Sequence, residues 1–263
     1  MKPYNDLIKW KSSPAKNSIG VLTGCNQNHE WLLKSWWHHF SKHNDLNVTF
    51  IDFGMSESAK LWCKTKGSII DMSGSHPWIT PKENISENVR KKWEKLYAPT
   101  LWGARACWLT KPVAFLQTPY TQNAWIDLDC IVRGNIRPLI DASNCTDGFA
   151  CVREVERSIE LSKQQGAIES NWIGYNAGVL SFQKGSLLVK KWAEKTVREN
   201  HIHMGDSDTL NHTLNANDFD FCELSDKFNR RPQDGILKNT LIAHYVCTGG
   251  KHALMQLFKS YQA

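Results

Sequence analysis

The chain has 263 residues, of which 41% are hydrophobic and 11% aromatic, and its formal net charge is +6. This apolar content excludes a disordered chain, and the length suits one α/β domain with a sizeable core. The mild basic excess fits a phosphate-bearing substrate, an anionic membrane surface or nucleic acid equally well, so charge alone does not choose among them.

Both chain ends carry weak signals. Residues 1–16 read as a polar amino-terminal extension ahead of a single domain over 17–263, and they lack the apolar segment of a signal peptide. No run of the chain is apolar enough to span a bilayer. Residues 254–259 could form a short amphipathic helix that packs on the body or touches a membrane. We therefore expect a cytoplasmic protein with, at most, a weak peripheral membrane contact.

The cysteines agree with a reducing compartment. There are eight of them, and they form no Cys-x-x-Cys pair. This pattern favours buried free thiols over a disulfide framework or a zinc ribbon.

Strand and helix patterns alternate along the first part of the chain. We predict strands at 17–23, 48–53 and 68–72, a long helix over 27–42, and a second helix from the turn at 54–56 to about residue 66. This β-α-β-α-β order is typical of a parallel sheet with right-handed crossovers.

The rest of the chain continues the same alternation. We predict helices at about 86–96, 104–116, 156–165, 186–200 and 207–215, and strands at 123–132, 148–153, 174–182 and 241–246. No repeat and no linker composition interrupts it. The expected fold class is α/β, a Rossmann-like sandwich with a mainly parallel central sheet flanked by helices.

Two carboxylates stand inside the apolar run Asn-Ala-Trp-Ile-Asp-Leu-Asp-Cys-Ile-Val at residues 123–132. Side chains two apart on a strand share a face, so Asp127 and Asp129 are expected to be neighbours. At about 4 Å and an effective dielectric constant of about 20, their repulsion is roughly 4 kcal/mol, which a bound divalent cation would offset. The alternative is that Asp127 is hydrogen-bonded in the core while Asp129 caps the next turn.

The chain contains two other Asp-x-Asp triplets, at 206–208 and 218–220, so the triplet alone does not identify a metal site. The first opens a predicted helix, where residues two apart do not face each other, and the second lies in a polar stretch typical of a loop. Only the Asp127 triplet ends a buried strand.

Ligands of open α/β sheets bind at the carboxyl ends of the strands. Thr23 and Gly24 end the first strand, Asp127 and Asp129 end the acidic strand, and His244 belongs to the last strand of the predicted sheet. We expect these groups to converge. Two carboxylates and one imidazole accept Mg²⁺ but suit Mn²⁺ better.

A second group of possible metal ligands comprises His201 and His203, followed by Asp206 and Asp208. These residues lie in and after a turn between two predicted helices. Helix capping and solvent exposure are the commoner roles there, and we favour them.

Four ordered segments, 125–136, 175–180, 206–211 and 244–251, resemble the motif series of GT-A fold glycosyltransferases. They are similar to the family 8 retaining galactosyl- and glucosyltransferases, and the pair Lys111-Pro112 also resembles related mannosyltransferases. The resemblance implies a metal-dependent catalytic domain over 17–263. It would move a hexose, with retention, from a nucleotide-diphosphate sugar to a glycan, lipid-linked saccharide or protein. A UDP-sugar is the favoured donor and a GDP-sugar is possible.

The resemblance also implies roles for individual residues. Asp127, Asp129 and His244 would hold Mn²⁺ or Mg²⁺ on the diphosphate of the donor, where the cation neutralises charge on the leaving nucleotide. The remaining roles concern phosphate, nucleotide and sugar contacts. Lys251 with Gly249 and Gly250 would meet the phosphates, Thr23 and Gly24 the nucleotide, and the catalytic candidates Asn176, Asp208 and Asp206 the donor sugar.

The sequence departs from the family pattern at three places. Residues 23–26 lack the acidic residue that many members use to read the base, which leaves the nucleotide open. Ser207 stands where some members carry a Gln, which leaves the nucleophile and the stereochemical outcome open. The spacing from His244 to Lys251 is one residue longer than usual.

Three other functions compete with this hypothesis. A nucleotidyltransferase also uses paired Asp residues, but it normally has a Gly-rich basic phosphate loop, and residues 24–29 contain one glycine and no Lys or Arg. A noncatalytic nucleotide-sugar binding module is disfavoured by the intact Asp127, Asp129 and His244. A nucleic-acid binder would suit the charge and the twelve tryptophans, yet no motif supports it, and we expect no nucleic-acid partner.

Overall fold

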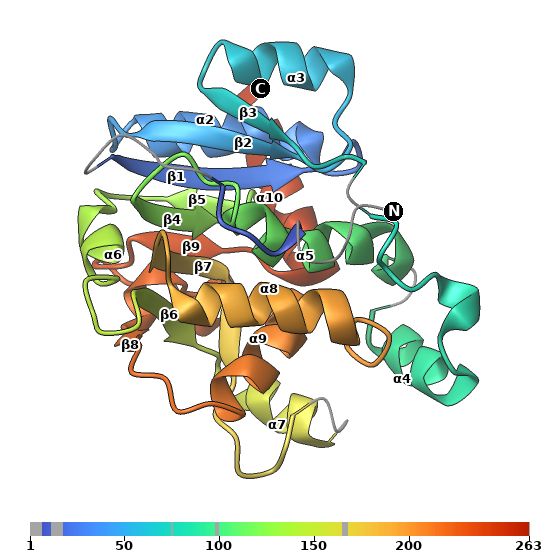
Figure 1. The fold of residues 1–263 in the computed structure, drawn as a ribbon. Coiled ribbons are helices and arrows are strands. Elements are labelled where there is room, and N and C mark those ends of the chain that lie inside the picture. Colours follow the sequence, from blue (N-terminus) through green and yellow to red (C-terminus); the bar gives the residue numbers. More distant parts are fainter. Residues whose placement is uncertain (1–6, 12–17, 75, 98–99, 165–167, 263) are drawn as a thin grey trace.

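A seven-stranded sheet runs through the middle of the molecule with helices packed on both of its faces (Figure 1). The computed structural model describes residues 7–11, 18–74, 76–97, 100–164 and 168–262. The strand order is β3-β2-β1-β4-β7-β6-β8. The strands are β1 Ile19–Cys25, β2 Asn47–Asp52, β3 Ser68–Asp71, β4 Gln122–Ile126, β6 Phe149–Arg153, β7 Tyr175–Gln183 and β8 Cys222–Leu224.

Most strand pairs are parallel, as predicted. β3, β2, β1 and β4 run parallel to one another, and so do β6 and β8. β7 runs antiparallel to both of its neighbours, β4 and β6. The mainly parallel α/β class expected from the alternating pattern is confirmed.

Helices and short 3-10 turns connect the strands. The longer helices are α2 Leu33–Ser41, α3 Glu57–Lys64, α4 Glu87–Tyr97, α5 Leu101–Phe115, α7 Glu156–Gln164, α8 Leu187–Glu199, α9 Asp206–Asn215 and α10 Cys247–Gln262. The short ones are η1 Glu30–Leu32, η2 Lys82–Asn84, α6 Arg137–Asp141, η3 Asp226–Phe228 and η4 Pro232–Asp234. The helix predicted to begin at residue 27 begins later, because the Asn26 side chain accepts a hydrogen bond from the Asn28 amide (3.1 Å) and holds a turn there.

Two hydrophobic clusters fill the two sides of the sheet. On one side Phe115 of α5 and Trp192 of α8 pack around Phe182 of β7, with Phe115 stacked on Phe182 at 4.8 Å between ring centroids. On the other side Trp36 and Phe40 of α2 stack at 4.9 Å and cover β2. Burial of such large aromatic groups is the main force that holds the helices on the sheet.

The acidic segment differs from the prediction in one respect. β4 ends at Ile126, so Asp127 and Asp129 lie in a turn and not on a strand. The Cys130 amide donates to the Asp127 carbonyl at 3.1 Å and closes this turn. The expectation of two carboxylates on one strand face was wrong, because the chain bends as soon as it leaves the sheet.

The last strand also lies elsewhere than predicted. β9 Ile242–His244 is not part of the main sheet; it pairs antiparallel with β5 Cys130–Val132. In this two-stranded ribbon Cys130 is opposite His244. The ribbon therefore brings His244 directly beside the turn that carries the two carboxylates.

The chain ends pack on the body where they are described. Ile8 is buried, and Trp10 packs against Phe182 with ring centroids 6.4 Å apart. The rest of the predicted extension, residues 1–6 and 12–16, lies outside the described residues. At the other end Leu254 of α10 is buried and Phe258 contacts the ring of Trp31. Among the residues with described positions, no helix is long and apolar enough to cross a bilayer.

Candidate metal and donor site

The turn after β4 presents Asp127 to a mixed polar environment. One carboxylate oxygen, Oδ1, accepts hydrogen bonds from Trp125 Nε1 (2.6 Å) and Lys111 Nζ (3.2 Å). The Asp127 amide donates to the Gly178 carbonyl at 2.8 Å and fixes the turn to β7. Burial raises the pKa of Asp127, and the Lys111 charge opposes this shift while the nearby Asp129 adds to it.

Asp129 is the most strongly paired carboxylate of the site. Its Oδ1 lies 3.2 Å from His244 Nε2, and its Oδ2 accepts a hydrogen bond from Lys251 Nζ at 2.6 Å. Burial opposes ionisation of Asp129, but the charges and hydrogen bonds of His244 and Lys251 outweigh it and hold the pKa of this carboxyl well below its usual range. Asp129 is therefore ionised in the folded protein.

His244 is oriented by an amide on the side away from the carboxylates. Its Nδ1 lies 2.7 Å from Asn229 Oδ1, and Asn229 Nδ2 donates to Asn176 Oδ1 at 2.9 Å. With Nδ1 donating to Asn229, Nε2 is directed to Asp129 at 3.2 Å and to Asp127 Oδ2 at 3.9 Å. Such a partner on the second ring nitrogen is typical of metal-binding histidines.

Gly178 of β7 leaves the room that these groups occupy. A Cβ at this position would lie 2.2 Å from His244 Cε1 and 2.9 Å from both Asp127 Oδ2 and Asn176 Oδ1. Only a residue without a side chain allows the imidazole and the carboxylate to meet over this strand. The site is thus a cradle that any other residue at position 178 would fill.

Cys130 also lies within this cluster. With Asp129 and His244 it forms a buried group of possible metal ligands. Burial raises the pKa of the Cys130 thiol well above its usual range, and the two neighbouring carboxylates add to the effect. A neutral thiol is a weak ligand, so the oxygen and imidazole groups are the better donors for a hard or borderline cation.

Lys111 is a site residue that sequence reasoning noted only as part of a family likeness. It lies on α5, its residue surface is only 4% exposed, and its ammonium group contacts both Asp127 and Asp206 as well as the Ala177 carbonyl (3.2 Å). Burial lowers its pKa, but the two carboxylates outweigh burial and raise it, so Lys111 stays charged. The available signal was a lysine inside the apolar run Leu-Thr-Lys-Pro-Val-Ala-Phe-Leu at 109–116.

The start of α9 reaches the same cluster. Asp206 is paired with Lys111, and the Ser207 hydroxyl accepts a hydrogen bond from the Ala177 amide at 3.2 Å. The described contacts of Asp208 lie on another side of the helix, where its Oδ2 accepts from the Met204 amide at 2.9 Å. The structure therefore joins Asp206 to the Asp127 cluster and turns Asp208 toward the loop that precedes α9.

Lys251 reaches the site because the chain turns sharply after β9. Cys247, the first residue of α10, has φ 63° in the left-handed region. A Cβ on Gly250 would lie 2.4 Å from the Tyr245 carbonyl carbon, whereas Gly249 has open space. The close approach of Gly250 to the preceding loop folds the first turn of α10 back toward Asp129.

The two candidates at the end of β1 are engaged in the sheet. Thr23 is fully buried and its hydroxyl donates to the Ile126 carbonyl at 2.7 Å. Gly24 lies where a Cβ would be 2.4 Å from the Ile51 carbonyl oxygen. Both residues thus support the strand next to the acidic turn, and their contact with a nucleotide stays a prediction.

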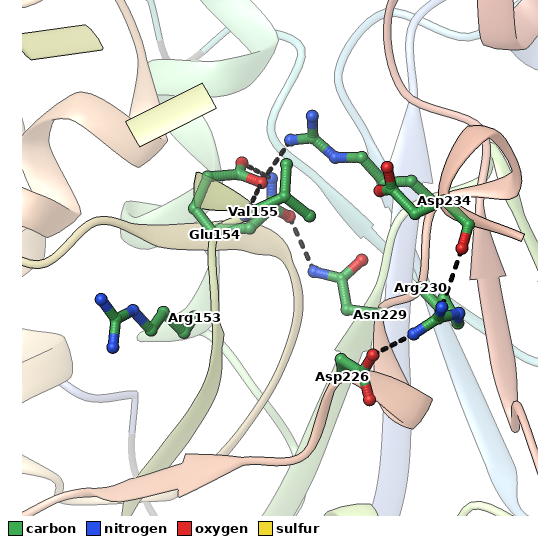
Figure 2. Close-up of a pocket in the computed structure, with 9 residues that line it drawn as sticks. Arg153, Glu154, Val155, Asp226, Asn229, Arg230 and Asp234 are labelled. Carbon is green, nitrogen blue, oxygen red and sulfur yellow. Dashed lines mark hydrogen bonds and ion pairs between the residues drawn. The ribbon is translucent and has the colours of Figure 1, made fainter. Parts of the chain in front are cut away.

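A polar pocket adjoins the cluster through Asn176 and Asn229. Its other lining residues are Arg153, Glu154, Val155, Asp226, Arg230, Arg231 and Asp234. Figure 2 shows Arg230 directed to Asp226 and Arg153 pointing away from the other labelled residues. Glu154 links pocket and cluster, since it accepts from Asn176 Nδ2 at 3.0 Å and pairs with Arg231 at 2.5 Å. The sequence did not predict this pocket, because its lining residues come from segments far apart in the chain.

Sequence comparison gives no match. No protein-family model matches the chain, and no curated protein sequence matches it.

Solved structures do match. The galactosyltransferase LgtC, solved with donor and acceptor sugar analogues, has a TM-score of 0.56 and 15% identity over 92% of this chain and 95% of that chain. Mouse xyloside xylosyltransferase 1 has a TM-score of 0.56 and 15% identity over 88% of this chain and 99% of that chain. GlyE of Streptococcus pneumoniae TIGR4 has a TM-score of 0.53 and 17% identity, over 88% of this chain but 55% of that chain.

These similarities extend over almost the whole chain at low identity, so they concern the fold. They agree with the fold that the sequence resemblance implies. The chain has the GT-A fold of these glycosyltransferases.

Proposed function

We propose that the protein is a metal-dependent glycosyltransferase that moves a hexose, with retention of configuration, from a nucleotide-diphosphate sugar to an acceptor. The observation that carries this proposal is the convergence of Asp127, Asp129 and His244 beside Lys251 at the end of β4. Two parts of the chain far apart in sequence, residues 127–129 and 244–251, supply these groups. The GT-A fold supports the same conclusion.

The metal-ligating side chains of the site fit Mn²⁺, with Mg²⁺ as the alternative. Asp127, Asp129 and His244 would hold it, because Gly178 leaves space for them and Asn229 orients the imidazole. When bound, the cation neutralises negative charge on the diphosphate of the leaving nucleotide.

The surrounding residues bind and orient the donor. Lys251, already held at Asp129, offers a positive charge to the phosphates, and Gly249 leaves open space beside it. Lys111 pairs with both Asp206 and Asp127 and holds the two carboxylates close together. The other donor contacts follow from the resemblance. Thr23 and Gly24 would meet the nucleotide, and Gly250 the phosphates. Asn176 and Asp206 are the candidates for the sugar hydroxyls, because Asp208 is turned toward the loop before α9.

A UDP-sugar is the donor that we favour, with a GDP-sugar as the second choice. The acceptor is a glycan, a lipid-linked saccharide or a protein, and the polar pocket beside Asn176 and Asn229 is the place we assign to it. We infer a cytoplasmic location, with at most peripheral membrane contact, because all eight cysteines are free thiols.

The test is nucleotide release from UDP- and GDP-sugars, with Mn²⁺ or with excess chelator. We expect slow, Mn²⁺-dependent donor hydrolysis that is lost in Asp129→Asn and kept in Asp218→Asn, an exposed carboxylate of another Asp-x-Asp triplet. Equal turnover in chelator would overturn the proposal. Pyrophosphate release from a nucleoside triphosphate would favour a nucleotidyltransferase, and nucleotide-sugar binding without turnover would favour a noncatalytic module.

A further inference from the structure

A second group of metal-ligating side chains lies at the start of α9, outside the site described above. It comprises His203, Asp208 and His212, whose candidate ligand atoms all lie within 4.8 Å of one another. Asp208 and His212 are one helical turn apart on α9, and His203 lies in the loop between α8 and α9, which pack against each other (Figure 1). The spacing of four residues places both α9 side chains on one face of the helix.

This group differs from the one considered in the sequence. His201 is exposed, and Asp206 is turned to Lys111. His212, a turn further along the helix, takes their place. Sequence reasoning missed it because the ligand pair spans the capping turn and the helix body.

The distances in the cluster are too long for hydrogen bonds and close to those between ligands of one ion. His203 Nδ1 lies 3.6 Å from Asp208 Oδ2, and His212 Nε2 lies 3.9 Å from Asp208 Oδ1. Two ligands at roughly 2.0–2.1 Å from a tetrahedral Zn²⁺ are about 3.3 Å apart. Small side-chain rotations would bring these atoms to that separation.

Asp208 carries a buried oxygen for which the described part of the chain offers no hydrogen-bond partner. Its side chain is 10% exposed, and Oδ1 accepts no hydrogen bond from the described residues, while Oδ2 accepts from the Met204 amide. A buried carboxylate oxygen without a donor is costly. A cation between Oδ1 and the imidazoles would satisfy it.

Glu199 supplies the outer partner that a metal-bound imidazole requires. With His203 Nδ1 facing Asp208, the opposite nitrogen Nε2 lies 3.4 Å from Glu199 Oε2, and Lys195 Nζ holds this same oxygen at 2.9 Å. A carboxylate on the second ring nitrogen fixes the tautomer that leaves the other nitrogen free to coordinate. The ring of Trp172 packs edge-on against His212 at 4.7 Å and limits its motion.

We propose that His203, Asp208 and His212 form a Zn²⁺ site. Two imidazoles and one carboxylate are typical zinc ligands, and three protein ligands leave a fourth position for water. The His212 side chain is 30% exposed, so the ion has access from solvent. Bound Zn²⁺ ties the α8–α9 loop to the first turns of α9, and this binding does not depend on the proposed sugar transfer.

The test is calorimetric titration of the metal-free protein with ZnCl₂ in an Asp129→Asn background, which disables the first site. We expect one equivalent of Zn²⁺ to bind and to raise the thermal midpoint. His203→Ala and His212→Ala in the same background should each weaken binding at least about tenfold and abolish the thermal shift. His201→Ala is the matched control, because this exposed histidine lies two residues from His203.

Co²⁺ adds a spectroscopic readout that a merely structural histidine would not alter. The background protein should give the intense visible absorption of a tetrahedral Co²⁺ complex, and His212→Ala should lose it. Circular dichroism checks folding, and the partly exposed His212 keeps the test valid if His203→Ala unfolds. Absence of Zn²⁺ binding in the background, or unchanged affinity in folded His212→Ala, would overturn the site.

Discussion

Gly178→Ala is a sharp test of how the first site is built. In an ordinary strand this change gains about 0.5–1 kcal/mol, because alanine loses less backbone entropy on folding. Here the new methyl carbon would lie 2.2 Å from His244 Cε1, whereas nonbonded carbons prefer about 3.5–4.0 Å. The imidazole would have to move by more than an ångström while tied to Asn229 at 2.7 Å and Asp129 at 3.2 Å.

We expect the overpacking to reverse the sign of the effect. Gly178→Ala should lose about 1–3 kcal/mol of unfolding free energy in urea and bind Mn²⁺ at least about tenfold more weakly. Gly103→Ala is the control. Gly103 lies inside α5, and its new Cβ would have Asn28 Nδ2 as its nearest neighbour, at an ordinary contact distance of 3.7 Å. We expect this change to raise the unfolding free energy by up to about 1 kcal/mol. A Gly178→Ala protein as stable as the parent, with unchanged Mn²⁺ affinity, would refute the claim that the absence of a side chain at position 178 makes room for His244 and Asp127.

Three further predictions concern buried charge and thiols. Lys111→Met should cost about 3–5 kcal/mol in urea unfolding, because it removes a buried cation from the buried Asp206 and the partly buried Asp127. Lys190→Met on the surface should cost less than about 1 kcal/mol, and equal losses would contradict the ion-pair assignment. The folded pKa of Asp129 lies below its unfolded value of about 3.9, so its contribution to stability is complete above that pH and is lost as the pH falls through the folded pKa. The metal-free Asp129→Asn protein should therefore lose less stability than the parent between pH 5 and pH 3, a range of about one unit on each side of that value. If the urea midpoints of the two proteins fell equally over this range, the pairing of Asp129 would be contradicted. Burial raises the pKa of Cys63 to about 12, so iodoacetamide should label the exposed Cys247 before Cys63. Peptide mapping of the parent and of a Cys247→Ser variant measures this order. Equal labelling rates of the two cysteines would contradict the burial of Cys63.

Local pattern was enough to predict the layered α/β architecture. Apolar runs of strand length alternating with amphipathic helices leave few ways to bury both, and the parallel β1–β4 half of the sheet follows from that order. Asp127 and Asp129 were visible for a related reason, since paired charges after an apolar run need compensation. Their proximity to His244 was expected from the strand ends and is present in the structure.

The position of His244 shows where that reasoning stops. The prediction placed it on the last strand of the main sheet, but it reaches Asp129 through the small β5–β9 ribbon. Residues 130 and 244 pair across a long stretch of chain. A three-residue strand has too little pattern to reveal its partner, so only the folded chain decides this pairing.

The sequence by itself determined the order of strands and helices, the fold class and the two carboxylates at the end of β4. These features follow from periodicity and from the cost of placing charge beside apolar residues, which are local quantities. The tertiary structure alone decided that Lys111 bridges Asp127 and Asp206, that Gly178 makes room for His244, and that His212 completes a second cluster. Such contacts depend on how separate elements pack, and side chains on different elements carry no local mark of one another.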